Sequence, residues 1–296
     1  MNKKADISLK GSFLLSNLLC TSISFIQCLL IALLAACVVV CFALTPEFAV
    51  KNIKSPNYSS FALAEMTEDL NDLSIPAGLP HDFFDEKLNE AELNEFENLL
   101  TLKLTSVIKG KQFKVDVDAI KAKFKGYVDE YVSEHLGLAD TVSSKAVTQF
   151  INECTTTYLE YLNPTVFQFV FNNFSKMEKI VLIAAIVIFI IIIAAFILLF
   201  KLCSNKDFCK YMFLTFSGGG LILGAIPAYL LLTDELSKIG ITQKSLHGFM
   251  YSFSSNFLTL FVVAAGILVF ISLIFLLLEI KSYTTKNSAE QTAKKT

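Results

Sequence analysis

The residues best suited to metal or acid–base chemistry are the three histidines and the carboxylates beside them. Imidazole and carboxylate groups together bind divalent cations; His81 precedes Asp82, and His135 follows Glu134. Zinc hydrolases place two histidines at a fixed spacing such as HExxH, and no two histidines share such a spacing here. We therefore expect structural or solvated roles for these two histidines and for His247.

The acidic triplet Asp116-Val117-Asp118 is the other motif that resembles a cation site. Calcium loops of the EF-hand type combine spaced carboxylates with a central glycine and a closing glutamate. The chain after Asp116 lacks both, whereas an aspartate before an apolar helical pattern is a typical N-cap. The triplet therefore predicts a helix start. We expect no catalytic, cofactor-binding or metal-binding residues.

Seven cysteines offer thiol chemistry, and only Cys154 lies in the long polar segment, so no disulfide is expected within that segment. Cys203 and Cys209 lie close together in a short loop with lysines, where oxidation or acylation stays open. Leu34-Ala35-Ala36-Cys37 resembles a bacterial lipoprotein cleavage box. It lies deeper than a signal peptide of about 15–30 residues would place it, and valines follow, so we favour an uncleaved helix.

A cluster of glycines stands out in an apolar segment, and its members are Gly218, Gly219, Gly220 and Gly224, followed by Pro227. Gly220 and Gly224 form a small-xxx-small pair, which lets membrane helices approach closely. Proline inside a helix predicts a local kink. We favour helix packing for all five residues. The alternative is an unwound segment that lines a substrate path.

Long apolar segments must position these residues, since 54% of the chain is hydrophobic. The segments 11–46, 180–200, 211–233 and 245–278 contain no Asp, Glu, Lys or Arg. A bilayer core of about 30 Å needs about 20 apolar residues in a helix. Soluble helices are rarely apolar on every face over such a length, so each segment predicts a membrane span.

We expect an all-α membrane protein with four transmembrane helices and an extracytoplasmic helical-bundle domain between the first and second spans. The expected parts are a cytoplasmic arm and interfacial helix (1–22), span 1 (23–44), the extracytoplasmic domain (45–179), span 2 (180–200), a cytoplasmic loop (201–210), span 3 (211–233), an external loop (234–252), span 4 (253–278) and a cytoplasmic tail (279–296).

The orientation follows from the lysines, because short cytoplasmic loops retain an excess of positive charge. The arm, the 201–210 loop and the tail are rich in lysine, whereas the 45–179 segment is net acidic. We therefore expect a multi-pass plasma-membrane protein with both termini in the cytoplasm. The chain contains no arginine, and its acidic outer segment argues against nucleic acid as a ligand.

Within the outer segment, breaks and apolar periodicity predict helices at about 59–73, 82–108 and 141–162, with Asp82 capping the second. Another helix face extends from Ile120 to Leu136. These helices would form a small bundle with short connections.

The span exit with its proline, the Gly78-Leu79-Pro80 entry to an acidic helix and the Gly110-Lys111 turn before Asp116 form a loose pattern. In this order the chain resembles uncharacterised four-span membrane proteins of low-GC Gram-positive bacteria over about 42–136. The resemblance implies a bacterial plasma membrane and brings no known activity or site residues.

Our leading hypothesis is a non-enzymatic protein whose outer helical domain binds, senses or scaffolds at the cell envelope. We expect it to contact the lipid bilayer and a protein partner, or a second copy, in the membrane. The alternative is a transporter or ABC-type permease subunit, with the span 3 glycines lining a path or the outer domain relaying motion. The scarcity of charged residues within the spans weakens that alternative.

Overall fold

The computed structural model describes residues 3–54, 56–109, 111–135, 144–162, 174–203 and 205–293. All regular elements in these ranges are helical, which confirms the predicted fold class at this level. The chain divides into two compact units. We call one the bundle unit (Met1–Phe42, Glu178–Leu236 and Ser255–Thr296) and the other the helical domain (Ala43–Met177 and Ser237–Ser254).

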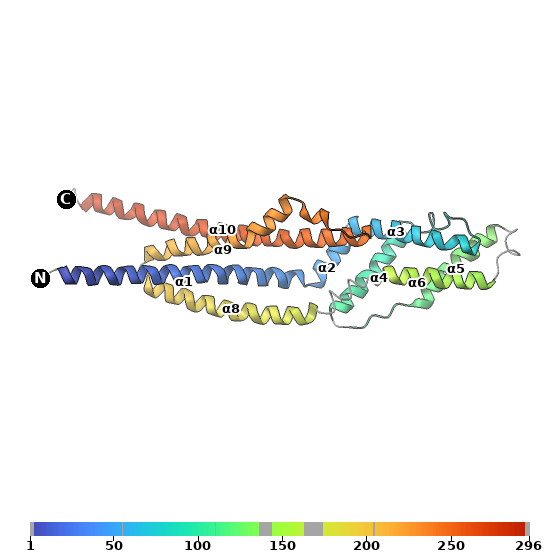
Figure 1. The fold of residues 1–296 in the computed structure, drawn as a ribbon, viewed down its shortest axis with the longest axis horizontal. Coiled ribbons are helices and arrows are strands. Elements are labelled where there is room, and N and C mark those ends of the chain that lie inside the picture. The colour runs from blue at the N-terminus through green and yellow to red at the C-terminus, as the bar shows by residue number, and fades with distance from the viewer. Residues whose placement is uncertain are drawn as a thin grey trace. The chain divides into compact units, whose positions relative to one another are not determined.

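Long apolar helices that lie along one another form the bundle unit, and they are α1 (Lys3–Ala43), α8 (Phe174–Leu202), α9 (Asn205–Leu232) and the greater part of α10 (Lys244–Ala293) (Figure 1). Within the described ranges, four segments are long and apolar enough to cross a membrane: Asn17–Ala43, Lys176–Leu202, Asp207–Leu232 and Lys244–Lys281. The four predicted spans therefore correspond to four helices.

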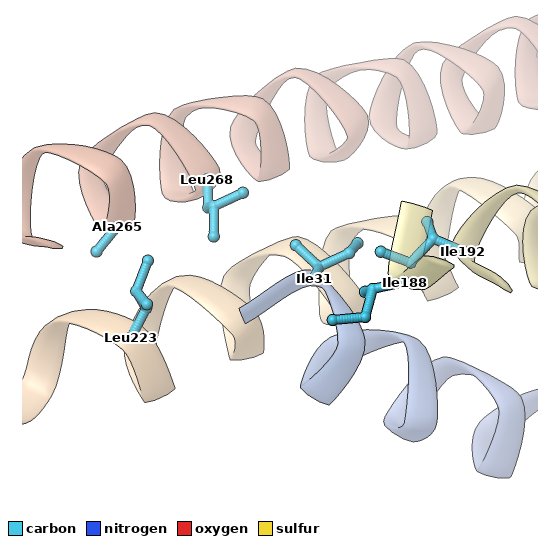
Figure 2. Close-up of a cluster of buried hydrophobic side chains, with 6 residues drawn as sticks. All are labelled: Ile31, Ile188, Ile192, Leu223, Ala265 and Leu268. Carbon is cyan, nitrogen blue, oxygen red and sulfur yellow. The ribbon is translucent and has the colours of Figure 1, made fainter. Parts of the chain in front are cut away.

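The core of the bundle unit draws aliphatic side chains from all four of these helices. Figure 2 shows Ile31 of α1, Ile188 and Ile192 of α8, Leu223 of α9, and Ala265 and Leu268 of α10. By contrast, Ile183 on α8 is 63% exposed and Phe270 on α10 is 66% exposed. Apolar side chains that are exposed on the outside of the bundle are expected for helices that are surrounded by lipid hydrocarbon.

The helical domain contains α2 (Pro46–Ile53), α3 (Pro56–Ser74), the 3₁₀ turn η1 (Ile75–Ala77), α4 (Glu90–Ile108), α5 (Val117–Glu134), α6 (Ser144–Tyr161), the 3₁₀ turn η2 (Glu235–Lys238) and the first turns of α10. Aromatic rings form part of its core, together with aliphatic side chains. The ring centroid of Phe84 lies 5.9 Å from that of Phe124 and 6.0 Å from that of Phe150. Such pairs contribute about 0.5–1.5 kcal/mol each beyond the burial of apolar area.

Two predicted helix starts in this domain have different outcomes. Asp116 caps α5 as predicted, because its carboxylate accepts the backbone N–H of Ala119 at 3.0 Å. The prediction that Asp82 caps one helix over 82–108 is wrong, since α4 begins at Glu90 with Asn89 as its cap. Gly110, Leu136 and the predicted break at Asn163-Pro164 lie outside the described residues.

A tertiary contact explains why the chain before Asn89 forms turns and not a helix. The side-chain oxygen of Asn71, on α3, accepts the N–H of Phe84 at 2.8 Å, and its amide donates to Asp85 at 2.7 Å. Phe83 and Phe84 are both buried, although they are adjacent in sequence. A regular helix with one apolar face does not bury two adjacent large rings so fully.

Two helices of the bundle unit extend beyond the predicted spans. Helix α1 is continuous from Lys3, so the predicted 1–22 arm and the first span belong to one helix. Helix α10 begins at Lys244, inside the predicted 234–252 loop, and its residues up to Ser254 belong to the helical domain.

Candidate functional site

The bundle unit contains the predicted glycine cluster, on α9. A Cβ atom on Gly218 would lie 2.8 Å from the Cys28 sulfur, and one on Gly219 would lie 3.2 Å from the Cys28 carbonyl oxygen. These two glycines therefore allow the backbone of α1 to approach α9 closely.

The other glycines of the cluster face α10. A Cβ on Gly220 would lie 2.8 Å from the Val269 side chain and 3.0 Å from the Ala265 carbonyl oxygen. A Cβ on Gly224 would lie 2.7 Å from the Cβ of Ala265. Pro227 lies one turn further on, inside the helix and buried. Gly218 and Gly219 thus pack against α1, and Gly220 and Gly224 pack against α10. The surface of α9 at these glycines is covered by the two neighbouring helices.

Polar side chains accompany this packing on the buried face of α1. The Ser24 hydroxyl lies 2.8 Å from the Thr215 hydroxyl and 3.1 Å from the Tyr211 carbonyl oxygen, so it links α1 to α9. Gln27 lies on the same face and is fully buried. Neither polar atom of its amide has a hydrogen-bond partner among the described residues. Among the buried polar side chains that the structure describes in the bundle unit, Gln27 is the one left without a hydrogen-bond partner.

A charged cluster in the described part of the helical domain joins α4, α5 and α6. Lys123 forms ion pairs with Glu92 and, at 2.7 Å, with Glu95. The Tyr127 hydroxyl donates to Glu92 at 2.7 Å. The side chains of Glu92 and Lys123 are only 16% and 20% exposed, so their attraction is less screened than that of a surface pair. We call these four residues and Tyr158 the carboxylate–tyrosine cluster.

Tyr158 brings α6 into the cluster. Its side chain is buried between the rings of Phe96 and Phe124 at centroid distances of 5.7 and 5.9 Å. Its hydroxyl has no hydrogen-bond partner among the described residues. Burial, and then the charges of Glu95 and Glu92, raise the pKa of Tyr158 well above its usual range. The hydroxyl therefore stays neutral near the charges of these two carboxylates.

The same part of the domain holds a second lysine by aromatic contacts. The Lys87 ammonium lies 5.7 Å from the ring centroid of Phe83 and 5.4 Å from that of Tyr127, and it pairs with Glu130 at 2.7 Å. Carboxylates and aromatic faces are the groups that bind ammonium ions. Here the protein's own lysines occupy them, so the arrangement ties α5 to the chain around α4.

A third feature joins α3 to the start of α10. The Glu65 carboxylate accepts the backbone N–H of Lys244 at 2.6 Å, the N–H of Ser245 at 3.3 Å and the Ser245 hydroxyl at 2.5 Å. An anion at a helix N-terminus satisfies free N–H groups and complements the helix dipole. Glu65, on α3, thus caps the N-terminus of α10. No local sequence motif predicts this contact.

Aromatic packing reinforces this junction. The ring centroid of Phe249 lies 6.0 Å from that of Tyr58, and the ring centroid of Phe253 lies 5.2 Å from that of Phe48. Burial, and then the charge of Glu65, raise the pKa of Tyr58 above its usual range. The first turns of α10 are therefore an integral part of the helical domain.

The histidines are dispersed. His81 pairs with Asp72 at 3.3 Å on the surface, His135 stacks on Tyr131 with centroids 4.2 Å apart, and a ring nitrogen of His247 lies 3.3 Å from the Ser237 carbonyl oxygen. In the part of the chain that the structure describes, no group of three or more His, Cys, Asp or Glu residues could hold a metal ion.

The cysteines contain one pairing that sequence spacing did not indicate. The Cys203 thiol contacts Cys20, on α1, with the sulfur atoms 2.6 Å apart. Cys209, the neighbour suggested by sequence, lies on α9 and is half-buried. Cys37 is also half-buried, within α1.

Comparisons with protein-family models, curated proteins and solved structures find no match for this chain.

Proposed function

We propose that this chain is a non-enzymatic integral membrane protein whose helical domain lies outside the cytoplasm and binds, senses or scaffolds at the cell envelope. The observation that carries the proposal is the Glu65 cap on α10. Because of it, one helix begins inside the helical domain and continues as the fourth candidate span. An event that alters α3 therefore acts directly on a membrane helix.

The lysine distribution supports the orientation. The 201–210 loop and the segments at both ends are basic, and the helical domain is acidic. A bacterial plasma membrane is the compartment that we propose, with the helical domain on its outer face.

Hydrogen exchange of the full chain in liposomes tests the proposed coupling, with Glu65→Ala compared against Glu68→Ala. Glu68 lies on the same helix, one turn further on, and is exposed. Loss of an N-cap costs about 1–2 kcal/mol, which corresponds to about tenfold faster exchange at the start of α10. We expect Glu65→Ala, and not Glu68→Ala, to accelerate exchange at 244–254 and also within 255–278. Acceleration confined to 244–254 would contradict the coupling.

Cysteine labelling in intact cells tests the orientation. In a background with all native cysteines replaced by serine, Glu86→Cys reports on the helical domain and Lys281→Cys on the end of the fourth span, since both positions are exposed. A membrane-impermeant maleimide should label position 86 in intact cells and position 281 only after permeabilisation. The reverse pattern would overturn the proposed topology.

A transporter or permease subunit is the second candidate, and Gln27 is the observation that favours it. A fully buried amide without a partner among the described residues is costly in a membrane bundle and is typical of polar sites that serve a function. Purification of the full chain from its native membrane tests this candidate. ATP hydrolysis in the purified complex would favour a permease role, and a preparation without it would weigh against one.

A further inference from the structure

Cys20 and Cys203 are far apart in sequence and in contact in the bundle unit. Their sulfur atoms lie 2.6 Å apart, whereas a disulfide bond measures about 2.05 Å. Cys20 lies on α1, and Cys203 follows directly after the last residue of α8. A small movement of either side chain would bring the two sulfurs to bonding distance.

The two thiols differ in access. Cys20 is 2% exposed and belongs to a core cluster with Leu199, Tyr211 and Met212. Cys203 packs against this cluster and is only half-buried. Cys203 is therefore the more accessible residue of the pair to a reagent from solution, and its sulfur contacts that of the buried Cys20.

We propose that Cys203 and Cys20 form a redox pair, in which Cys203 reacts first with a small-molecule disulfide and Cys20 resolves the product as a Cys20–Cys203 disulfide. The sequence alone pointed to Cys203 and Cys209 as the reactive thiols. The contact between sulfur atoms makes Cys20, and not Cys209, the proposed partner of Cys203. The oxidised form would covalently join the first span to the loop between the second and third.

The chemistry balances as thiol–disulfide exchange. The Cys203 thiolate attacks one sulfur of the reagent, the reagent S–S bond breaks, and one reagent thiolate leaves. The Cys20 thiolate then attacks the Cys203 sulfur and releases the second reagent thiolate. The two protons lost from the cysteines end on the released thiols. Two cysteines are oxidised, and one reagent disulfide is reduced to two thiols.

Burial, more than the neighbouring charges, makes this reaction slow at neutral pH. Burial, then the contact with Cys20 and the charge of Asp207, raise the pKa of Cys203 above its usual range, and Tyr211 lies in the same cluster. The thiolate fraction, and hence the rate of the first step, therefore rises about tenfold for each pH unit between pH 7 and 9. The lysine rule places this end in the cytoplasm, where the dithiol is the resting form.

Glutathione disulfide with the full chain in detergent micelles tests the pair. After oxidation, free thiols are blocked with N-ethylmaleimide, the protein is digested, and cross-linked peptides are quantified by mass spectrometry. We expect the Cys20–Cys203 peptide to exceed the Cys203–Cys209 peptide by at least about tenfold, because exchange needs direct contact between sulfurs. A dominant Cys203–Cys209 link would overturn the proposal, as would no link in folded protein when unfolded protein forms one.

Isosteric variants complete the test. Cys203→Ser and Cys20→Ser should each abolish the link, and Cys209→Ser, the matched control, should leave its yield unchanged. Circular dichroism and elution volume establish that each variant is folded. The cross-link measurement on the wild-type protein does not depend on any variant. It can therefore refute the proposal even if one of the variants does not fold.

Discussion

The carboxylate of Glu65 lies 2.5 Å from the hydroxyl oxygen of Ser245, although the two residues belong to different helices. The contact closes the N-terminus of α10 with a charge from α3. It makes the start of α10, the fourth candidate span, part of the helical domain. Substitution of either residue tests this contact directly.

Replacing Glu65 should destabilise the domain more than replacing its partner. Glu65→Gln removes the charge that serves two backbone N–H groups and one hydroxyl, and hydrogen bonds to charged groups contribute about 1.5–3 kcal/mol. Ser245→Ala removes only the hydroxyl bond. We expect a lower melting temperature by circular dichroism for Glu65→Gln than for Ser245→Ala. Equal melting temperatures would mean that the backbone cap contributes nothing.

The glycines of α9 differ in what a side chain would meet, which gives a matched pair of variants. Gly220→Ala should destabilise the bundle by about 1–3 kcal/mol, because the new Cβ would lie 2.8 Å from Val269 and 3.0 Å from a backbone oxygen. Gly266→Ala, on α10, should be neutral or stabilising, since a Cβ there meets nothing within 4 Å. Thermal unfolding in detergent compares the two. A tolerated Gly220→Ala would contradict the close packing of α9 and α10.

Tyr127 should give the helical domain a stability that is lost in alkali. Burial, followed by its hydrogen bond to Glu92, raises the pKa of Tyr127 in the folded state above its ordinary value of about 10. The stabilisation is therefore fully present below pH about 10 and decreases as the pH rises above this value. Thermal melts from pH 7 to 11 should show Tyr127→Phe less stable than wild type at pH 7. The difference should shrink above pH 10, and a constant difference would exclude this linkage.

Cys154 should report unfolding of the helical domain. Its side chain is fully buried, and burial, followed by the charge of Glu153, raises its pKa to about 12. A maleimide at pH 7.5 should therefore not modify Cys154 in the folded chain and should modify it once urea unfolds α6. Cys209, which is half-buried, serves as the reactive comparison in the same sample. Rapid modification of Cys154 without urea would show that α6 opens locally.

Local patterns predicted part of the helical domain well. The helix predicted at 59–73 is α3, at Pro56–Ser74, and the helix predicted at 141–162 contains α6, at Ser144–Tyr161. Their periodicity and breakers are local signals. The start of α4 was missed because Asn71, on another helix, holds the preceding residues in turns.

The candidate sites divide in the same way. The spacing of the glycines drew attention to α9, and the coordinates add which helices lie against them, α1 and α10. The carboxylate–tyrosine cluster was not predicted. Glu92 and Glu95 read as one face of an acidic helix, and only the arrangement of α4, α5 and α6 placed Lys123, Tyr127 and Tyr158 beside them.

Hydropathy is enough to predict four apolar helices of membrane-spanning length, because a bilayer core requires internal hydrogen bonding and about 20 apolar residues for each crossing, and the described part of the chain contains four such helices. Coordinates were needed to show where α10 begins, which thiol contacts Cys203 and which carboxylates lie near Tyr158. Each of these contacts joins side chains from helices far apart in sequence. Hydropathy and periodicity describe one helix at a time and say nothing of its neighbours.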